Sequence, residues 1–352
     1  MTTPGAGQGK RRIDTMEELA VAIGVSRPTL SRYFQDPERV SRSSRARIEQ
    51  GLEQVEYIPN FFATRMNRKT TGIIGVIIPY LNDLFFSKLL EAIERAAMEA
   101  GYTVITQCSH FDPLIEARAA ETLMSMSVDG ALVAPLGNHS DLKVHDRLRA
   151  RLPFVLVDSR PDNMLDVEFV GTNHMQSTGL AVEYLCRVGA PPVFLAMPRV
   201  SFNAMARERA YLAKMEELGH EPRIIGTEPV EPGWLFEEHG QAVLDREFAA
   251  GRLIDASVLC VNDRIAIGAL RAAATHGLEP GARRNGGLRI MGHDDYPLCP
   301  FLTPTLTTVA QDVEAIGRAS VQQLVNTIRG EKTPDEQRVK LIDGEIKARE
   351  SA

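Results

Sequence analysis

The sequence predicts a small all-α helix-turn-helix domain at the N-terminal end, followed by an α/β region that contains two doubly wound parallel sheets. Three observations predict this organisation. Helix-capping residues cluster before residue 60, apolar strands alternate with amphipathic helices after residue 71, and the two regions differ in charge. A chain of 352 residues is too long for one ordinary domain and suits one small module with two larger lobes.

The first two predicted helices are defined by their capping residues. Thr15 and Glu18 have the spacing of a capping box, which predicts a helix that begins after Thr15 and stops at Gly24. Ser26 then caps a second helix, and Pro28 lies in its first turn, where a missing N–H costs nothing. Two short helices joined at a glycine predict a helix-turn-helix.

A third helix, from about Ser43 to Val55, supplies the apolar stripe that two short helices need to bury their own apolar faces. We therefore expect a flexible leader over residues 1–13, a helix-turn-helix domain over residues 14–59, and a hinge helix or linker over residues 60–71.

The distribution of charge indicates nucleic acid as a partner of this first domain. Residues 1–71 contain 12 lysines and arginines against 8 aspartates and glutamates, although the whole chain has a net charge of −6. A basic module on an acidic body is what a protein needs if the module alone contacts phosphates, because each neutralised phosphate releases condensed counterions. A chance imbalance is the alternative that the motifs must exclude.

Several protein classes are excluded by what the sequence lacks. No run approaches the roughly 18 apolar residues that cross a bilayer, and the polar, Gly-rich start has no signal-peptide core. The 4 cysteines form no Cys-x-x-Cys pair and the 8 histidines show no metal-ligand spacing. No nucleophile elbow, zinc-protease motif or Walker loop is present. We expect a cytoplasmic protein that is not an enzyme and uses no metal, cofactor, disulfide or membrane contact.

After residue 71, short apolar runs alternate with amphipathic helices. The runs predicted as strands are Ile73–Ile78, Tyr102–Thr106, Gly130–Ala134, Phe154–Val157, Val193–Met197, Val258–Val261 and Leu288–Met291. Near-continuous apolar strands between helices are typical of parallel sheets covered on both faces. Ligands of such sheets bind beyond the carboxyl ends of the strands, and polar residues collect at these positions in this chain.

Three motifs recur together near the N-terminus. Gly-Val-Ser and Thr-Leu-Ser lie in the run Thr15–Ser31, Val40-Ser41 follows, and Tyr-x-Pro-Asn closes the region at Tyr57–Asn60. At this spacing they resemble the headpiece of the LacI/GalR family. The residues that the resemblance places on DNA are Thr15, Ser26, Arg27, Pro28, Thr29, Ser31, Arg32, Asn60 and Met66.

The resemblance implies two kinds of DNA contact. Arg27 and Arg32 lie where the family places side chains against base edges in the major groove, and an arginine there can bond a guanine bidentately. Pro28, at the third such position, offers only apolar contact. Met66 occupies the hinge position from which the family inserts a leucine into the minor groove.

The resemblance extends over nearly the whole chain. Further matching motifs are Gly75–Pro79, Val128–Gly130, Val157-Asp158, Val261–Asp263, Gly292–Asp295 and Leu306–Val309. It implies a periplasmic-binding-protein-like sensor over residues 72–345. Its first lobe is expected at about 72–170 and 305–332, and its second at about 171–304 and 333–345.

The same resemblance implies a ligand pocket between these lobes. The effector-binding residues that it implies are Asp83, Phe85, Pro135, Asp158, Arg160, Arg207, Trp234, Asn262 and Asp294. Carboxylates and amides suit vicinal hydroxyls, an arginine donates several hydrogen bonds, and aromatic rings can cover an apolar face. A sugar or polyol is therefore the expected ligand.

Together these features predict a sequence-specific transcription regulator, a repressor that its effector releases from DNA. The expected partners are palindromic double-stranded operator DNA, a small carbohydrate, and a second copy of the chain, because one headpiece reads too few base pairs. A corepressor-dependent regulator is an alternative. A solute-binding transport protein and a sugar-modifying enzyme are two others, and the basic first domain without an export signal disfavours the transport protein.

Overall fold

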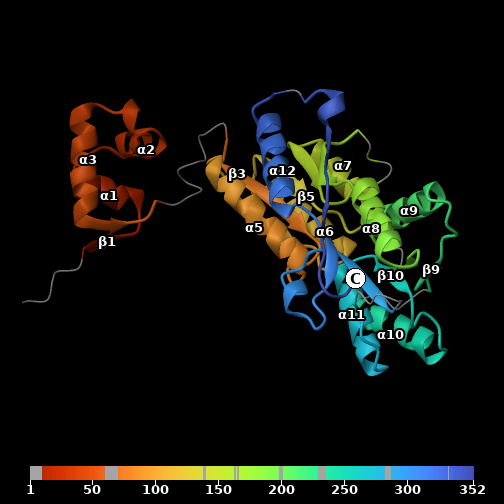
Figure 1. Ribbon diagram of the computed structural model, residues 1–352. Coiled ribbons are helices and arrows are strands. Elements are labelled where there is room, and N and C mark those ends of the chain that lie inside the picture. The colour runs from red at the N-terminus through yellow and green to blue at the C-terminus, as the bar shows by residue number, and fades with distance from the viewer. Residues whose placement is uncertain are drawn as a thin grey trace, which may run out of the picture. The chain divides into compact units, whose positions relative to one another are not determined.

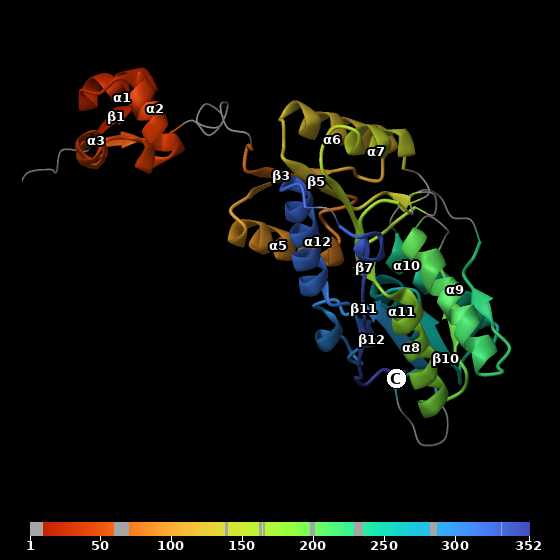
Figure 2. The same ribbon diagram turned by 90° about the horizontal axis from the view of Figure 1, so that it is seen from above.

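The computed structural model describes residues 10–59, 70–137, 140–161, 164, 166–197, 201–228, 235–281, 287–331 and 333–352. The chain forms two compact units, Met1–Thr71 and Gly72–Ala352, which we call unit 1 and unit 2. Figures 1 and 2 show both units.

The described part of unit 1 contains three α-helices around a small apolar core. Its elements are β1 (Arg11–Ile13), α1 (Met16–Ile23), α2 (Arg27–Gln35), η1 (Pro37–Arg39), α3 (Arg42–Gln54) and β2 (Val55–Tyr57). The core contains Leu19, Ala20, Leu30 and Ile48, so each of the three helices contributes to it. The three helices expected from the capping residues are confirmed, and each begins within one residue of its expected position.

Two details of unit 1 differ from the sequence-based expectation. Residues 1–13 were expected to be a flexible leader, but β1 pairs in parallel with β2, and Ile13 is 4% exposed because its side chain completes the core. In the expected capping box, Thr15 does accept a hydrogen bond from the N–H of Glu18. The carboxylate of Glu18, however, accepts from the N–H of Asp14 rather than from the N–H of Thr15.

Unit 2 contains two six-stranded sheets. From one edge to the other, the first has the order β4 (Thr103–Cys108), β3 (Ile73–Ile78), β5 (Gly130–Val133), β6 (Phe154–Val157), β7 (Phe169–Thr172) and β13 (Val339–Ile342). The second has the order β14 (Glu345–Lys347), β12 (Thr307–Ala310), β11 (Arg289–Asp294), β10 (Ser257–Cys260), β8 (Val193–Leu195) and β9 (Ile224–Ile225). All described strand pairs of unit 2 are parallel except β12 with β14, so the prediction of two doubly wound parallel sheets is confirmed.

Helices cover these sheets. They are α5 (Leu84–Glu99), α6 (Pro113–Ser125), α7 (Leu142–Arg149), α8 (His174–Val188), α9 (Phe202–Glu217), α10 (Phe236–Ala249), α11 (Asp263–Thr275) and α12 (Val313–Ile328), with the short helices η3 (Cys299–Phe301) and η4 (Asp335–Gln337). On the first sheet, α5 packs against α12 on one face and α6 against α7 on the other (Figure 2). On the second sheet, α8 packs against α9 and α10 against α11. None of the helices described is long and apolar enough to cross a membrane.

The chain passes between the two sheets three times: after β7, between β12 and α12, and between β13 and β14. The expected lobe boundaries are therefore wrong for two strands. Residues 305–332 were expected in the first lobe, yet β12 pairs with β11 of the second sheet. Residues 333–345 were expected in the second lobe, yet β13 pairs with β7 of the first. Both runs are typical of strands, but only pairing decides which sheet a strand joins.

The close contact between α10 and α11 gives a test of the packing of the second lobe. A Cβ atom at Gly268 would lie 1.9 Å from the backbone oxygen of Glu237, so one helix must move. We expect Gly268→Ala to lower the free energy of unfolding by about 1–3 kcal/mol despite the better helix propensity of alanine. Urea unfolding followed by circular dichroism measures this.

Gly179, in the interior of α8, is the matched control. A Cβ atom there would meet the end of the flexible Lys214 side chain, with Cε at 3.1 Å and Nζ at 4.0 Å. Gly179→Ala should leave stability unchanged or raise it. Equal urea midpoints for the two variants would contradict the close approach of α10 and α11.

Candidate functional site

The second helix of unit 1 is held at its start by a serine cap. The hydroxyl of Ser26 accepts a hydrogen bond from the N–H of Thr29 at 3.3 Å. Gly24 has a φ of 74°, which allows the chain to turn sharply between α1 and α2. Leu30 anchors α2 in the core. The opposite face of α2 is therefore free to present polar side chains to solvent.

The structure exposes most of the residues predicted to contact DNA. Thr15, Ser26, Arg27, Pro28 and Arg32 are exposed, whereas Thr29 and Ser31 are half-buried. The predicted residues Asn60 and Met66 lie outside the described residues.

One exposed arginine has a partner that the sequence did not suggest. The Nε atom of Arg27 lies 2.5 Å from Oε1 of Glu17, in the first turn of α1. An ion pair thus connects the two helices of the helix-turn-helix on its outer surface.

Unit 2 contains a cavity of about 60 Å³ that is lined by residues of both lobes. The predicted residues that line it are Asp83, Phe85, Asp158, Arg207, Asn262 and Asp294. Two predicted residues lie elsewhere. Pro135 is buried away from the cavity lining, and the guanidinium of Arg160 stacks over the ring of Phe169 at 5.2 Å. Trp234 lies outside the described residues.

Other side chains that line the cavity were missed by the sequence analysis: Ser201, Asn203, Phe236, Tyr296 and Gln311. Tyr296 directly follows the Asp294-Asp295 pair at the end of β11, so its position in sequence could have indicated it. Gln311 lies in the second crossover, and no pattern in the sequence marks it.

Arg207 and Asp294 form a buried ion pair on the second-lobe side of the cavity. The NH2 group of Arg207 donates to Oδ1 of Asp294 at 2.9 Å, and its NH1 group donates to the carbonyl of Val261 at 2.7 Å. The amide of Gln311 donates to the same carboxylate oxygen at 2.6 Å. Asp294 has a φ of 128°, an unusual backbone conformation for a non-glycine residue, so surrounding contacts must hold it in place.

Two first-lobe carboxylates receive hydrogen bonds from the second lobe. Asp83 caps α5 and accepts from the hydroxyl of Tyr296, and the guanidinium of Arg264 lies 3.4 Å from it. Asp158 accepts from the side-chain amide of Asn203 at 2.9 Å. These contacts join the lobes across the cavity, so the structure shows the lobes closed on each other.

Burial changes the ionisation of the groups at this cavity. It raises the pKa of Asp158 to about 7, and the charge of Arg207 opposes this shift. Burial also raises the pKa of Asp83 and of Asp294. It lowers the pKa of His174 and of His293 well below the usual value, so both imidazoles are neutral at pH 7.

The chemistry of these groups suits binding. Carboxylate and amide oxygens accept hydrogen bonds from hydroxyls, and amide and guanidinium groups donate to them. Within the described parts of the chain, no group of three or more His, Cys, Asp or Glu side chains could hold a metal ion.

The cavity is connected to the crossovers by hydrogen bonds. The side-chain oxygen of Gln311 accepts from the hydroxyl of Thr172, which ends β7 before the first crossover. Asn173, in that crossover, donates to Asp343 of the third crossover at 2.8 Å. Side-chain contacts therefore link all three crossovers, and the second carries a residue of the cavity itself.

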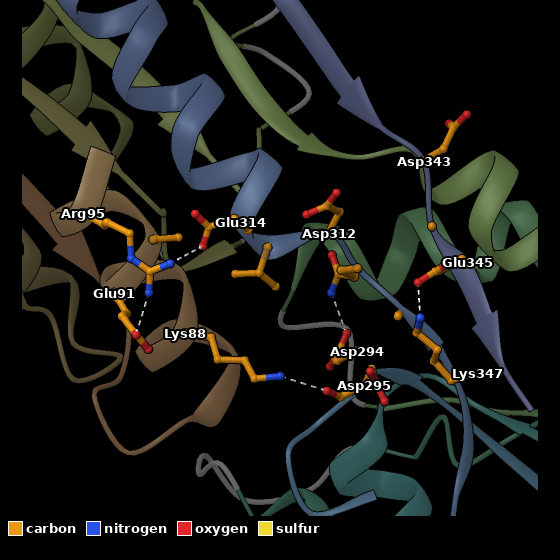
Figure 3. A pocket seen from close by; sticks show the side chains of 15 residues that line it. Lys88, Glu91, Arg95, Asp294, Asp295, Asp312, Glu314, Asp343, Glu345 and Lys347 are labelled. Carbon is orange, nitrogen blue, oxygen red and sulfur yellow. Dashed lines mark hydrogen bonds and ion pairs between the residues drawn. The ribbon is translucent and has the colours of Figure 1, made fainter. Parts of the chain in front are cut away.

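A larger crevice of about 620 Å³ lies beside the crossovers, and Asp294 and Gln311 line both it and the smaller cavity (Figure 3). Across this crevice, Nζ of Lys88 in α5 donates to the backbone oxygen of Asp295 at 3.2 Å, which is another contact between the lobes. The hydrogen bond from Gln311 to Asp294 thus forms part of the wall between two spaces.

Comparison with known proteins gives two matching family models. Residues 15–60 match bacterial regulatory proteins of the lacI family, and residues 182–352 match a periplasmic binding protein-like domain. The chain is 29% identical to the HTH-type transcriptional regulator MalR of Streptomyces coelicolor, over 91% of each chain. It is 26% identical to the ribose operon repressor of Escherichia coli, over 93% of this chain and 96% of that protein.

Solved structures share the fold. A crystal structure of the lac repressor dimer bound to operator and the anti-inducer ONPF has a TM-score of 0.82 and 23% identity, and the match covers 96% of this chain and 98% of that one. The complex of the transcriptional regulator CelR with cellobiose has a TM-score of 0.68 and 21% identity, covering 96% of this chain and 99% of that one.

The raised pKa of Asp158 predicts a pH effect on stability. Its pKa is about 7 in the folded protein and about 3.9 when unfolded, so the folded state binds the proton more tightly. The contribution of this proton to the free energy of unfolding is fully present below about pH 4 and is lost as the pH rises through 7. Between pH 5 and pH 8, the free energy of unfolding of wild type should fall by roughly 2–3 kcal/mol relative to that of Asp158→Asn, because the asparagine has no proton to release.

Urea unfolding of both proteins at several pH values tests this. Asp166→Asn is the control, because Arg149 lowers the pKa of the exposed Asp166 and keeps it ionised over the same range. Its curve should stay parallel to that of wild type. A parallel curve for Asp158→Asn as well would show that the carboxyl of Asp158 keeps an ordinary pKa.

Proposed function

The chain belongs to the LacI family of bacterial regulatory proteins, and on that premise we propose that it is a repressor that binds operator DNA through unit 1 and is released by a sugar or polyol bound in unit 2. The observation that carries this proposal is the pairing of two sites in one chain. Unit 1 presents Arg27 and Arg32 on a capped, exposed helix face, and unit 2 collects hydrogen-bonding groups of two lobes around one cavity.

The relatives support both parts of the proposal. Those compared above are named as transcriptional regulators and a ribose operon repressor, and none is named as an enzyme or a transport protein. The structural neighbours were solved with operator DNA or with cellobiose. We place the protein in the cytoplasm as a homodimer on palindromic DNA, because paired heads read enough base pairs for useful selectivity. In this proposal Asn60 contacts DNA and Met66 enters the minor groove.

The size of the cavity explains how a ligand would act. Pockets for small molecules usually have about 300–1,000 Å³, so a cavity of about 60 Å³ admits no sugar while the lobes hold this arrangement. The ligand must therefore enter between separated lobes and replace contacts that Asp83 and Asp158 now make to Tyr296 and Asn203. A ligand that contacts the lobes differently in two arrangements shifts the balance between them. We propose that Trp234, the single tryptophan of the chain, is a further ligand contact.

DNA reading by α2 is tested with Arg32. In vitro selection from random DNA first supplies the operator, and the affinities of wild type and Arg32→Ala for operator and random DNA are then compared. We expect the variant to lose about 1–3 kcal/mol of discrimination, because an arginine on a guanine edge distinguishes bases by that amount. Arg12→Ala removes an equal charge from β1 and should retain discrimination. Equal losses on both DNAs for Arg32→Ala would refute base reading.

Effector binding is tested with Arg207. Ribose, maltose, cellobiose and galactose are titrated against the wild-type operator complex, and the sugar that acts is then used with Arg207→Ala. We expect the variant to bind operator normally. The sugar concentration that half-releases it from operator should be at least tenfold higher than for wild type, since a hydrogen-bonded charge pair commonly contributes more than about 1.4 kcal/mol. A sugar that strengthens operator binding would instead establish a corepressor.

The variant Arg207→Ala leaves Asp294 buried without its cationic partner, which destabilises a fold. The double variant Arg207→Ala with Asp294→Asn removes both charges and keeps the test clear if the single variant unfolds. An unchanged response in a folded double variant would place the effector outside this cavity.

A further inference from the structure

The ion pair between Glu17 and Arg27 has no role in the function described above. The two side chains are 61% and 65% exposed, and the pair joins the start of α1 to the first turn of α2. Arg32, the other predicted base-reading arginine, forms no ion pair with any described residue. The two arginines therefore differ in their electrostatic surroundings, because of the two only Arg27 has a carboxylate of a described residue beside it.

Stability gives little reason for this pair. Exposed ion pairs contribute little to folding because water screens them and both side chains lose freedom. The first turn of α1 is acidic without it, since Glu18 lies beside Glu17 and already interacts favourably with the helix dipole. A carboxylate on a surface that approaches DNA is also unfavourable in itself, because DNA is a polyanion.

The position of the carboxylate suggests what it does. An isolated exposed arginine can bond any nearby phosphate, and such contacts raise affinity for all sequences alike. The closest approach of Glu17 is to Nε of Arg27, which leaves the terminal nitrogens to donate in parallel to N7 and O6 of a guanine. The charge of Glu17 also offsets that of Arg27, so the pair attracts phosphate less than Arg27 would alone.

We propose that Glu17 is a positioning residue that determines DNA-sequence specificity: it orients Arg27 towards a base edge and suppresses the contacts of Arg27 with phosphate. This inference rests on the proposed DNA-binding function. It adds Glu17, beside the capping residue Glu18, to the residues that determine specificity.

The test compares Glu17→Gln with Glu18→Gln in the full chain. Each change removes one negative charge from the first turn of α1. Glu18 bonds the backbone of Asp14 rather than Arg27, and glutamine can keep that capping role. Each protein is subjected to in vitro selection from random DNA, and its affinity for the wild-type operator and for random DNA is measured as a function of salt.

We expect Glu17→Gln to bind random DNA more tightly and to reduce the ratio of operator to random affinity about fivefold or more, which is the low end of what one guanine contact provides. The selected sequences should lose their preference at one base pair in each half-site. The slope of the logarithm of affinity against the logarithm of salt concentration should become more negative by about one, as for one additional phosphate contact. Glu18→Gln should match wild type in selected sequence, and the melting temperature should stay the same in both variants.

Three results would overturn the inference. Glu17→Gln could match wild type in all measurements, which would make the pair an ordinary solvated contact. Its loss of preference could spread over all positions with a lower melting temperature, which would show a structural role. Its effect could persist in an Arg27→Ala background, which would show that it does not act through Arg27. If wild type itself selects no sequence, the proposed function fails. This outcome is distinct from failure of the inference about Glu17, because it is seen with wild type before any variant is compared.

Discussion

The buried ion pair between Arg207 and Asp294 is the interaction on which the arrangement of unit 2 depends. Burying a charge is costly unless the charge is paired and hydrogen-bonded, and here each partner has further hydrogen bonds. One of these comes from Gln311, which also accepts a hydrogen bond from Thr172 at the end of β7. The pair therefore connects the cavity to the crossovers, and a ligand that changed the contacts of Arg207, as proposed, would also affect these connecting segments.

Closure of the lobes follows from a second constraint. The first lobe contributes the carboxylates Asp83 and Asp158, and the second lobe supplies donors to both, in addition to the N–H of Phe85, which donates to Asp83 within the first lobe. Burial raises the pKa of both carboxyl groups, which means that closure has an electrostatic cost. A polyol whose hydroxyls donate to the same oxygens would replace the protein's own donors. Ligand and closed lobes would thus compete for the same acceptors, and the ligand would shift the equilibrium by as much as its affinities for the two arrangements differ.

Local signals in the sequence were sufficient for the helices of unit 1 and for strands such as Ile73–Ile78 and Phe154–Val157, because caps and apolar runs act within a few residues. The exchange of β12 and β13 between sheets could not be predicted in this way, since pairing joins segments far apart in the chain. Tyr296 and Gln311 reach the cavity through the same crossovers. Among the predicted residues that line the cavity, Asp158 and Asn262 follow strand ends, where ligands of parallel sheets are expected to bind, whereas Arg207 lies within α9 and was predicted only from the family resemblance.

The ion pairs of unit 1 bear on the DNA specificity that we propose for it. Although the region is basic overall, several arginines are already paired: Arg12 with Asp14, Arg39 with Asp36, and Arg45 with Glu38 and Glu49. Paired arginines attract phosphate less, and in the proposed function this limits binding to random DNA and leaves discrimination to the predicted base-reading side chains of α2. The pair of Arg27 with Glu17 extends this pattern to a position that we propose reads a base. Because it joins residues of two helices, the local sequence signals of either helix alone could not indicate this contact.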